Sequence, residues 1–232
     1  IIPIEDLIFE HRTYLPSFGF FLPLAASVFI ISGDRHKIYG TAFLIMVTAM
    51  WSFLTFQRNK VWKDDITLWS DVIKKSPKKP RPYNNRGFAF SKLNKPDQAI
   101  KDLNYAIEIG TNYYTAFNNR GNAYLKIGNY ENAISDYSKV IIDKTNKKNA
   151  LLGIAAANFN LNRWLDAVNY YSDFIAIDSS NADAFFDRGR SLENMGRVED
   201  AITDYSRALS INPSLKSGWY NRGLAWKKLN DL

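Results

Sequence analysis

The residues after Pro80 repeat themselves at a period of 34 residues, and this feature limits the fold more than any local pattern. A small residue recurs at the same place of every unit, as Gly87, Gly121, Ala155, Gly189 and Gly223. A unit of this length cannot bury its apolar face alone and must stack on its neighbours. The repeat therefore predicts an array of similar stacked units.

Within each unit, the apolar residues fall on two helical faces. The units are numbered from Pro80, Tyr114, Lys148, Ala182 and Lys216. Place 4 is large and apolar in every unit, and place 20 is alanine wherever it exists: Tyr83, Phe117, Leu151, Phe185 and Trp219, then Ala99, Ala133, Ala167 and Ala201. Places 4, 8 and 11 share one face of a first helix, and places 20, 24 and 27 share one face of a second.

Place 15 lies between the two helices and carries the residues that enter the left-handed region at least cost. They are Asn94, Gly128, Asn162, Gly196 and Asn230. Each unit is therefore predicted to be a helix, a tight turn and a second helix, and the fold class is all-α.

The pattern resembles the tetratricopeptide repeat. The segment Phe117-Asn-Asn-Arg-Gly-Asn-Ala-Tyr124, followed by Gly128-Asn-Tyr-Glu-Asn-Ala133 and Tyr137, follows that signature, and Pro213 occupies its closing proline. The resemblance covers residues 80–232, as units 80–113, 114–147, 148–181, 182–215 and a partial unit 216–232. It implies a right-handed α-solenoid that binds a protein or peptide in a concave groove. An unrelated array of helical hairpins is the alternative.

Residues 1–57 read as an extramembrane loop, 1–16, and a two-span transmembrane hairpin, 17–57. The second uncharged run, 38–56, spans about 28 Å as a helix, close to the thickness of the hydrocarbon core of a bilayer. The first run, 17–32, is shorter and contains Pro23, which is tolerated in lipid. A buried hairpin of a soluble protein is the alternative.

Residues 58–79 are predicted to form a membrane-proximal helix and a basic linker, with Asp64 as the helix N-cap and Trp69 on the packed face. In the repeat frame this helix is the second helix of a degenerate leading unit, which covers the start of the array. A basic cluster follows, formed by Lys74, Lys75, Lys78, Lys79 and Arg81. It is read either as a contact for anionic lipid headgroups or as a solvated linker.

A second resemblance begins at Glu10-His11-Arg12-Thr-Tyr14-Leu-Pro16-Ser17. Together with Arg58-Asn-Lys-Val-Trp62, Leu68-Trp69 and Lys75-Ser-Pro77, it is similar to the C-terminal half of polytopic membrane glycosyltransferases that use lipid-linked sugars, such as the transmembrane-and-tetratricopeptide O-mannosyltransferases. The resemblance implies that Glu10, His11 and Arg12 contact a lipid phosphate, unless they form a plain interfacial loop. The catalytic acidic residues of such enzymes lie in an early loop that this chain does not contain.

The composition argues against several other classes of site. The chain has no cysteine and only two histidines, His11 and His36, which lie far apart in the sequence, so neither a disulfide framework nor a metal site is expected. The net charge of +7 comes without a nucleic-acid-binding motif. We find no nucleophile paired with a base and no phosphate-binding glycine loop, and therefore assign no catalytic residue and no cofactor.

The tetratricopeptide resemblance implies which side chains line the groove, because places 2, 5, 6, 9, 12 and 13 of the first helices face away from the packed side. We predict a peptide-binding groove lined by Asn84, Asn85, Lys92, Asn118, Asn119, Asn122, Lys126, Leu152, Phe159, Asp187, Arg190, Asn221 and Lys228. Amides at place 6 can donate to and accept from a peptide backbone at once. Alternatively, these side chains are merely solvated. In the third unit the groove is predicted to be apolar.

Place 7 and place 23 vary together. Place 7 is Arg86, Arg120, Arg188 and Arg222, and place 23 is Asp102, Asp136 and Asp204; the third unit loses both, with Ile154 and Tyr170. We predict that each arginine bonds an aspartate of its own or the adjacent unit as a scaffold pair. At the surface such a pair would contribute about 0–1 kcal/mol.

These observations predict a membrane-anchored tetratricopeptide module that binds protein and is not itself catalytic. The alternatives are the acceptor-presenting C-terminal part of a protein O-glycosyltransferase that uses lipid-linked sugars, and a stand-alone assembly or secretion scaffold. The transferase resemblance places the array outside the cytoplasm, whereas Arg58, Lys60 and Lys63 favour the cytoplasm by the positive-inside rule; we take the former. Because Trp219 and Trp226 lack a covering second helix, we expect the protein to continue beyond Leu232.

Overall fold

The computed structural model describes residues 33–59, 63–110, 113–143 and 145–230, and within these ranges it is helical with no strand. The chain divides into two compact units, 1–63 and 64–232, which are considered separately. In the first unit the structure describes α2 (Gly33–Asn59). In the second it describes α3 (Asp65–Lys75), α4 (Pro80–Lys92), α5 (Pro96–Ile109), α6 (Tyr114–Lys126), α7 (Tyr130–Val140), α8 (Lys147–Asn160), α9 (Trp164–Ile177), α10 (Ala182–Asn194), α11 (Val198–Ile211) and α12 (Lys216–Asn230).

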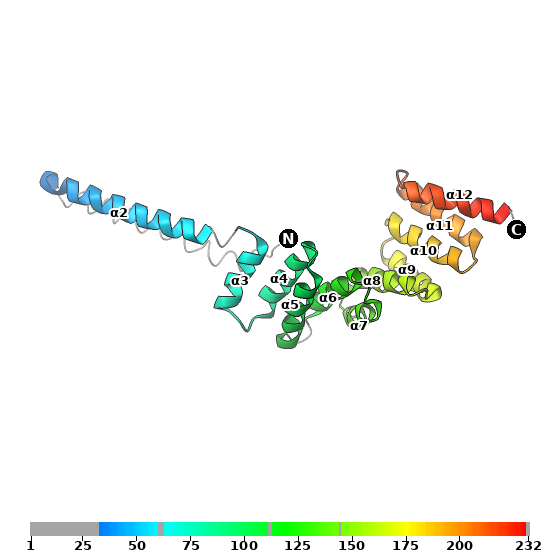
Figure 1. Cartoon of the computed structure of the whole chain (residues 1–232). Helices are drawn as coiled ribbons and strands as arrows, with labels where there is room; N and C mark the ends of the chain where they lie inside the picture. The colour runs from blue at the N-terminus through cyan, green and yellow to red at the C-terminus, as the bar shows by residue number, and fades with distance from the viewer. Residues whose placement is uncertain (1–32, 60–62, 111–112, 144, 231–232) are drawn as a thin grey trace. The chain divides into compact units, whose positions relative to one another are not determined.

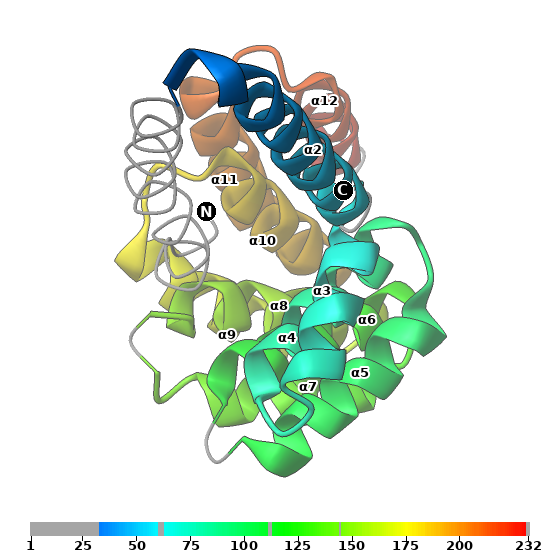
Figure 2. The same ribbon diagram turned by 90° about the vertical axis from the view of Figure 1, so that its left-hand side faces the viewer.

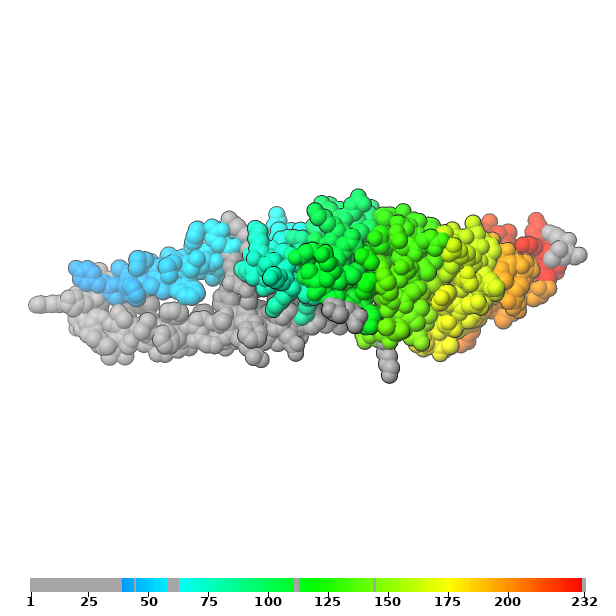
Figure 3. Space-filling model, turned by 90° about the horizontal axis from the view of Figure 1, so that it is seen from below, coloured from blue at the N-terminus to red at the C-terminus, as the bar shows by residue number. Residues whose placement is uncertain are grey.

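The second unit is a succession of antiparallel helix pairs, α4 with α5, α6 with α7, α8 with α9 and α10 with α11 (Figure 1). Helix α3 packs on α4 at the start of this succession, and α11 packs on α12 at its end. Figure 2 shows α3 beside α4 and α10 beside α11. In the space-filling view the colour bands of the pairs follow one another in chain order (Figure 3), as expected for a solenoid in which each repeat contacts its neighbours.

The turns inside the repeats have the predicted conformation. Asn94, Gly128, Asn162 and Gly196 have φ of 56°, 75°, 58° and 80°. In each turn the N–H of the following residue, at place 16, donates to the carbonyl at place 11 over 2.9 Å, which closes the first helix. The prediction for Asn230 is wrong, because α12 continues to this residue without a left-handed turn.

The core is built from the repeated places. The alanines at place 20, Ala99, Ala133, Ala167 and Ala201, are fully buried, as are Leu103, Tyr137 and Tyr205 at place 24. Short side chains at places 8 and 20 let two helices approach closely, and the large side chain at place 24 fills the space between them.

The leading helix α3 is fixed by a capping box. The Asp64 carboxylate accepts a hydrogen bond from the Thr67 N–H at 2.8 Å, and the Thr67 hydroxyl lies 3.3 Å from the Asp64 N–H. Trp69 is buried in this helix. The predicted cap at Asp64 is thus confirmed.

In the first unit, α2 contains one segment, Tyr39–Gln57, that is long and apolar enough to cross a membrane, judged by length and composition alone. Its mean hydropathy is 1.5 and 6% of it is buried. The predicted first span, 17–32, and the loop 1–16 with Glu10, His11 and Arg12 lie outside the described residues.

Candidate functional site

The candidate site is the side of the array formed by the first helices, α4, α6, α8, α10 and α12. We call places 5, 6, 9, 12 and 13 of these helices the first-helix face. Helix α4 lies beside α6, and α6 beside α8, so the face continues from one repeat to the next.

Asparagine side chains form a chain of hydrogen bonds across the first two repeats. The Asn119 amide donates to the Asn84 oxygen at 2.9 Å, and the Asn84 amide donates to the Asn85 oxygen at 3.1 Å. Asn84 is only 4% exposed, whereas Asn85 and Asn119 are half-buried. The sequence prediction that all of these amides line an open surface is therefore wrong for Asn84, which lies between α4 and α6 and orients its neighbours.

Asn118 is also buried, at 6% exposure, and its side-chain oxygen has no hydrogen-bond partner in the described part of the chain. The repeat pattern explains this. Asn84 accepts from place 6 of the next repeat, Asn119, but the residue that corresponds to Asn119 in the third repeat is Gly153, which has no side chain. Gly153 is required there because a Cβ atom would collide with the Tyr137 ring.

Lys92, Lys126 and Asn122 also belong to the first-helix face of the first two repeats. The Lys126 ammonium donates to the Ser91 carbonyl at 2.9 Å, and the Lys92 ammonium lies 4.6 Å from the centre of the Phe88 ring. Asn122 is exposed and accepts a hydrogen bond from the Tyr137 hydroxyl at 2.7 Å.

The next part of the face combines aromatic rings with an ion pair. The Arg190 guanidinium lies 4.4 Å from the centre of the Phe159 ring and 5.8 Å from that of Phe186, and it pairs with Asp187 at 3.2 Å. Burial raises the pKa of the Asp187 carboxyl, and the nearby Arg190 lowers it by less. With the half-buried Leu152, this region presents an aromatic, charge-paired surface. Leu152 and Phe159 of the third repeat lie on this face, where Arg190 covers the Phe159 ring, and their part in an apolar groove stays a prediction.

Tyrosines at place 24 of the second helices contact acidic residues of the first-helix face. The Tyr205 hydroxyl donates to Glu193 at 2.7 Å, and burial followed by this contact raises the pKa of Tyr205. Burial and the carboxylate of Asp187 raise the pKa of Tyr171 in the same way. From the sequence, place 24 was predicted to be a core position only. The repeated tyrosine there, in place of phenylalanine, was a sign that its hydroxyl contacts polar groups.

The remaining predicted residues lie on α12. Asn221 is half-buried and Lys228 is exposed. Within the residues that the structure describes, no group of three or more histidine, aspartate or glutamate side chains is arranged to hold a metal ion.

The predicted arginine–aspartate pairs are confirmed in three repeats and join the first helix of each of these repeats to its second helix. Arg86 binds Asp102, Arg120 binds Asp136 and Arg188 binds Asp204, each through two hydrogen bonds of 2.7–2.8 Å. The aspartates are buried, so these are not surface pairs.

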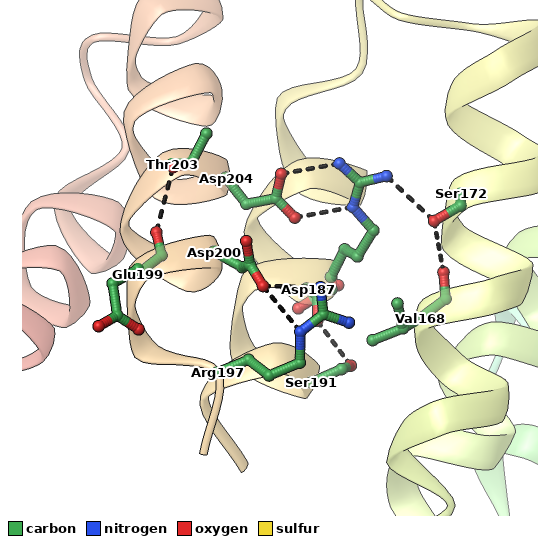
Figure 4. Close-up of polar contacts among 10 residues, drawn as sticks. Val168, Ser172, Asp187, Ser191, Arg197, Glu199, Asp200, Thr203 and Asp204 are labelled. Carbon is green, nitrogen blue, oxygen red and sulfur yellow. Dashed lines mark hydrogen bonds and ion pairs between the residues drawn. The ribbon is translucent and has the colours of Figure 1, made fainter. Parts of the chain in front are cut away.

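The same arginines also bind the preceding repeat. Arg86, Arg120, Arg188 and Arg222 donate to place 25 of the preceding unit, which is Ser70, Asn104, Ser172 and Ser206. Figure 4 shows one such guanidinium, with Asp204 on one side and Ser172 on the other. For Arg222 the prediction of an aspartate partner is wrong within the described residues, where Ser206 is its hydrogen-bond partner.

Comparison with known proteins agrees with the repeat pattern. A family model of the tetratricopeptide repeat matches residues 114–142 and 182–215, and a second model of this repeat matches residues 80–109. A search of curated proteins gave no match.

Among solved structures, that of YrrB, described as a TPR protein with an unusual peptide-binding site, aligns with a TM-score of 0.62 and 19% identity over 70% of this chain and 84% of its own. A MamA structure aligns with a TM-score of 0.59 and 24% identity over 62% and 84% of the two chains. The structure of MamA from Desulfovibrio magneticus RS-1 aligns with a TM-score of 0.62 and 18% identity over 66% of this chain and 86% of its own. At these identities the likeness shows the fold. Sequence period, helix pairs and family matches agree that this chain carries tetratricopeptide repeats stacked as an α-solenoid.

Proposed function

We propose that the array is a protein-interaction module whose first-helix face binds an extended segment of a partner protein. The observation that carries the proposal is the amide chain of Asn119, Asn84 and Asn85. Because Asn84 is buried and hydrogen-bonded on both sides, it holds the half-exposed Asn85 and Asn119 in fixed orientations. Preorganised amides suit the alternating donors and acceptors of a peptide backbone.

The second half of the face supports selectivity between such segments. Arg190 lies against two aromatic rings and beside the Asp187 carboxylate, so its guanidinium is held flat on the surface. We propose that Leu152 and Phe159 contact an apolar side chain of the bound segment, that Asn122, Asp187, Arg190 and Asn221 contact its polar groups, and that Lys92, Lys126 and Lys228 contact acidic ones.

The amide chain can be tested with peptides selected from a random library on the purified chain. We expect Asn119→Ala to weaken the selected peptides by about 1–2 kcal/mol, roughly tenfold, because one hydrogen bond to the peptide is lost and Asn84 loses a partner. Fluorescence anisotropy of labelled peptides measures the change. Asn132→Ala, at an exposed position of α7, is the matched control and should leave the affinity unchanged. Equal loss in both variants, or in neither, would contradict the proposal.

We further propose that α2 anchors the module in a membrane. Apolar side chains along this helix are exposed, with Ile45, Met46 and Phe53 each about 60% accessible. Burial of such a surface in lipid removes the cost of leaving it in water. The basic residues Lys74, Lys75, Lys78 and Lys79 follow in the sequence and favour an anionic membrane surface.

Because the chain has no cysteine, its membrane orientation can be read from one introduced thiol. Ser179 is exposed in the turn between α9 and α10. We expect the chain to remain in the membrane fraction after alkaline carbonate extraction, and Ser179→Cys to react with an impermeant maleimide in intact cells, as an extracytoplasmic array would. Labelling that appears only after lysis would assign the array to the cytoplasm, and loss from the membrane fraction would exclude the anchor.

A second candidate is the acceptor-presenting part of a membrane glycosyltransferase that uses lipid-linked sugars. It rests on the sequence segments at residues 10–17, 58–62 and 68–77, and it assigns a lipid phosphate to Glu10, His11 and Arg12. In that case the peptides bound by the first-helix face would include substrates of glycosylation. Loss of glycosylation of such a peptide in cells that lack the protein is the result that would support this candidate.

A further inference from the structure

The chain of amide hydrogen bonds in the first two repeats does not continue at Asn118. In the first repeat, the oxygen of Asn84 accepts from the Asn119 amide at 2.9 Å, and the Asn84 amide donates to Asn85 at 3.1 Å. Asn118 has the same place in the second repeat and is 6% exposed, but its oxygen has no hydrogen-bond partner within the described part of the chain. A buried acceptor without a partner costs free energy, so its presence in a folded protein requires an explanation.

The first-helix face of the third repeat supplies no donor for this oxygen. Helix α8 has only apolar side chains or none at places 5, 6, 9 and 12, which are Leu152, Gly153, Ala156 and Phe159. The Tyr137 ring occupies the space that a Cβ atom at Gly153 would take. The third repeat therefore cannot carry an amide at place 6 as the second repeat does.

Asn122 lies one turn further along α6 and presents the complementary group. Asn118 and Asn122 are four residues apart, so their side chains are neighbours on the helix surface. The exposed Asn122 accepts from the Tyr137 hydroxyl at 2.7 Å through its oxygen, and its amide nitrogen makes no hydrogen bond to a described residue. Burial raises the pKa of Tyr137, so the hydroxyl stays protonated and holds the Asn122 amide in this orientation. Helix α6 thus offers an acceptor and a donor side by side.

We propose that Asn118 and Asn122 bind the side-chain amide of a glutamine or asparagine in the bound segment, an inference that rests on the function proposed above. The N–H group of this amide donates to the Asn118 oxygen, as Asn119 donates to Asn84, and its oxygen accepts from the Asn122 amide. This assigns one residue type to one position of the bound segment.

Other polar side chains match the two asparagines less well. Lysine and arginine have no acceptor for the Asn122 amide, and ionised aspartate and glutamate have no donor for the Asn118 oxygen. A serine or threonine hydroxyl carries both functions on one atom and does not span the two side chains. The pair is therefore selective for a primary amide.

The burial of the Asn118 oxygen favours a side chain of the segment over its backbone. The oxygen is shielded from solvent, so a main chain that lies across the first-helix face does not reach it. A side chain that inserts beside α6 reaches it once the atoms that cover the oxygen move aside. Because the oxygen gives up no hydrogen bond of the described chain, the new bond is gained without breaking another at Asn118.

The peptides selected from the random library on the full chain provide the test. We expect them to share a glutamine or asparagine at one position, and replacement of this residue by alanine to weaken binding about tenfold. Replacement of a glutamine by glutamate, which has nearly the same shape, should weaken binding at least as much, because the donor is lost. Fluorescence anisotropy of the labelled peptides measures these changes.

Asn118→Leu tests the partner of this amide. It removes the acceptor and should abolish the difference in affinity between the glutamine and alanine peptides, as a double-mutant cycle measures. The urea midpoint of the free chain should rise, because an apolar side chain of similar size replaces an unpaired buried amide. Asn122→Ala, at an exposed position, is the second variant and should reduce the difference several-fold.

Asn119→Ala separates this inference from the proposed function. It should weaken the glutamine and alanine peptides equally, because Asn119 is assigned to the peptide backbone. If it does so while the wild-type chain binds both peptides equally, the amide site is wrong and the proposed function stands. If no peptide binds, or Asn119→Ala affects none, both fail.

Two further results would overturn the amide site alone. One is a difference between the glutamine and alanine peptides that persists in Asn118→Leu. The other is a lower urea midpoint of Asn118→Leu, which would mean that water already satisfies the Asn118 oxygen in the free chain.

Discussion

Arg188→Ala is expected to lower the free energy of unfolding by about 3–5 kcal/mol, because it leaves a buried carboxylate without its partner. The Asp204 side chain is 7% exposed and accepts two hydrogen bonds of 2.7 Å from Arg188. Without the guanidinium, water does not fully compensate the buried Asp204 carboxylate. The carboxylate must then either take up a proton, which costs free energy, or reach solvent through local unfolding. Urea denaturation of the full chain, followed by far-ultraviolet circular dichroism, measures the loss.

The repeats provide the control for this change. Arg222 has the same place and the same contact with the preceding repeat but no aspartate among the described residues, so Arg222→Ala should cost less than about 1 kcal/mol. Replacing both partners, with Arg188→Met and Asp204→Leu, should recover much of the stability, since apolar substitutes of similar volume need no compensation. If Arg188→Ala and Arg222→Ala lower the free energy of unfolding by similar amounts, the ion pair is not the source of the stabilisation by Arg188.

Gly153→Ala is expected to destabilise the array by about 1–3 kcal/mol, although alanine favours helix. The Tyr137 ring lies between two glycines, Gly121 on α6 and Gly153 on α8. A Cβ atom at Gly153 would lie 2.4 Å from the ring. The other edge of the ring already occupies the space that a Cβ atom at Gly121 would take, so the ring has little room to move towards α6. The shift in urea midpoint is the measurement.

The matched control is Gly223→Ala, where the new methyl group meets nothing within 4 Å. Helix propensity alone should then stabilise the chain by about 0.5–1 kcal/mol. A second test combines Gly153→Ala with Tyr137→Leu. Leucine is chosen because the first repeat has Leu103 at the same place 24. The double variant should be more stable than the sum of the single changes predicts, because the smaller side chain relieves the collision. Additive effects would mean that Tyr137 is not the obstacle.

Much of the fold follows from the sequence because the same places repeat. Helices, turns and the arginine–aspartate pairs depend on interactions within a repeat or with the next one. Comparing units reveals such interactions: the third unit has Ile154 and Tyr170 and so loses arginine and aspartate together.

The candidate site was less predictable, because it depends on the spacing between neighbouring first helices. Asn84 and Asn118 have the same helical phase as exposed polar residues, and the closeness of the next helix is what buries them. Gly153 stands at place 6, where the second repeat has Asn119, and it accommodates a tyrosine from the preceding repeat. A single repeat pattern carries no information on such contacts across helices.

The contacts of each place 7 arginine with the preceding repeat have a mechanical consequence. They tie α3 to α4, α5 to α6, α9 to α10 and α11 to α12. Ile154 on α8 makes no such bond, so Ser138 on α7, which donates to its own helix as Ser172 and Ser206 do, has no arginine to accept from. The exposed pair of Arg163 with Glu131 crosses the same junction, although a solvated pair contributes little. Apolar contacts tolerate sliding that directional hydrogen bonds resist. A load along the array is therefore resisted between α7 and α8 by packing, where the Tyr137 ring lies against Gly153, and at the other junctions by these hydrogen bonds as well.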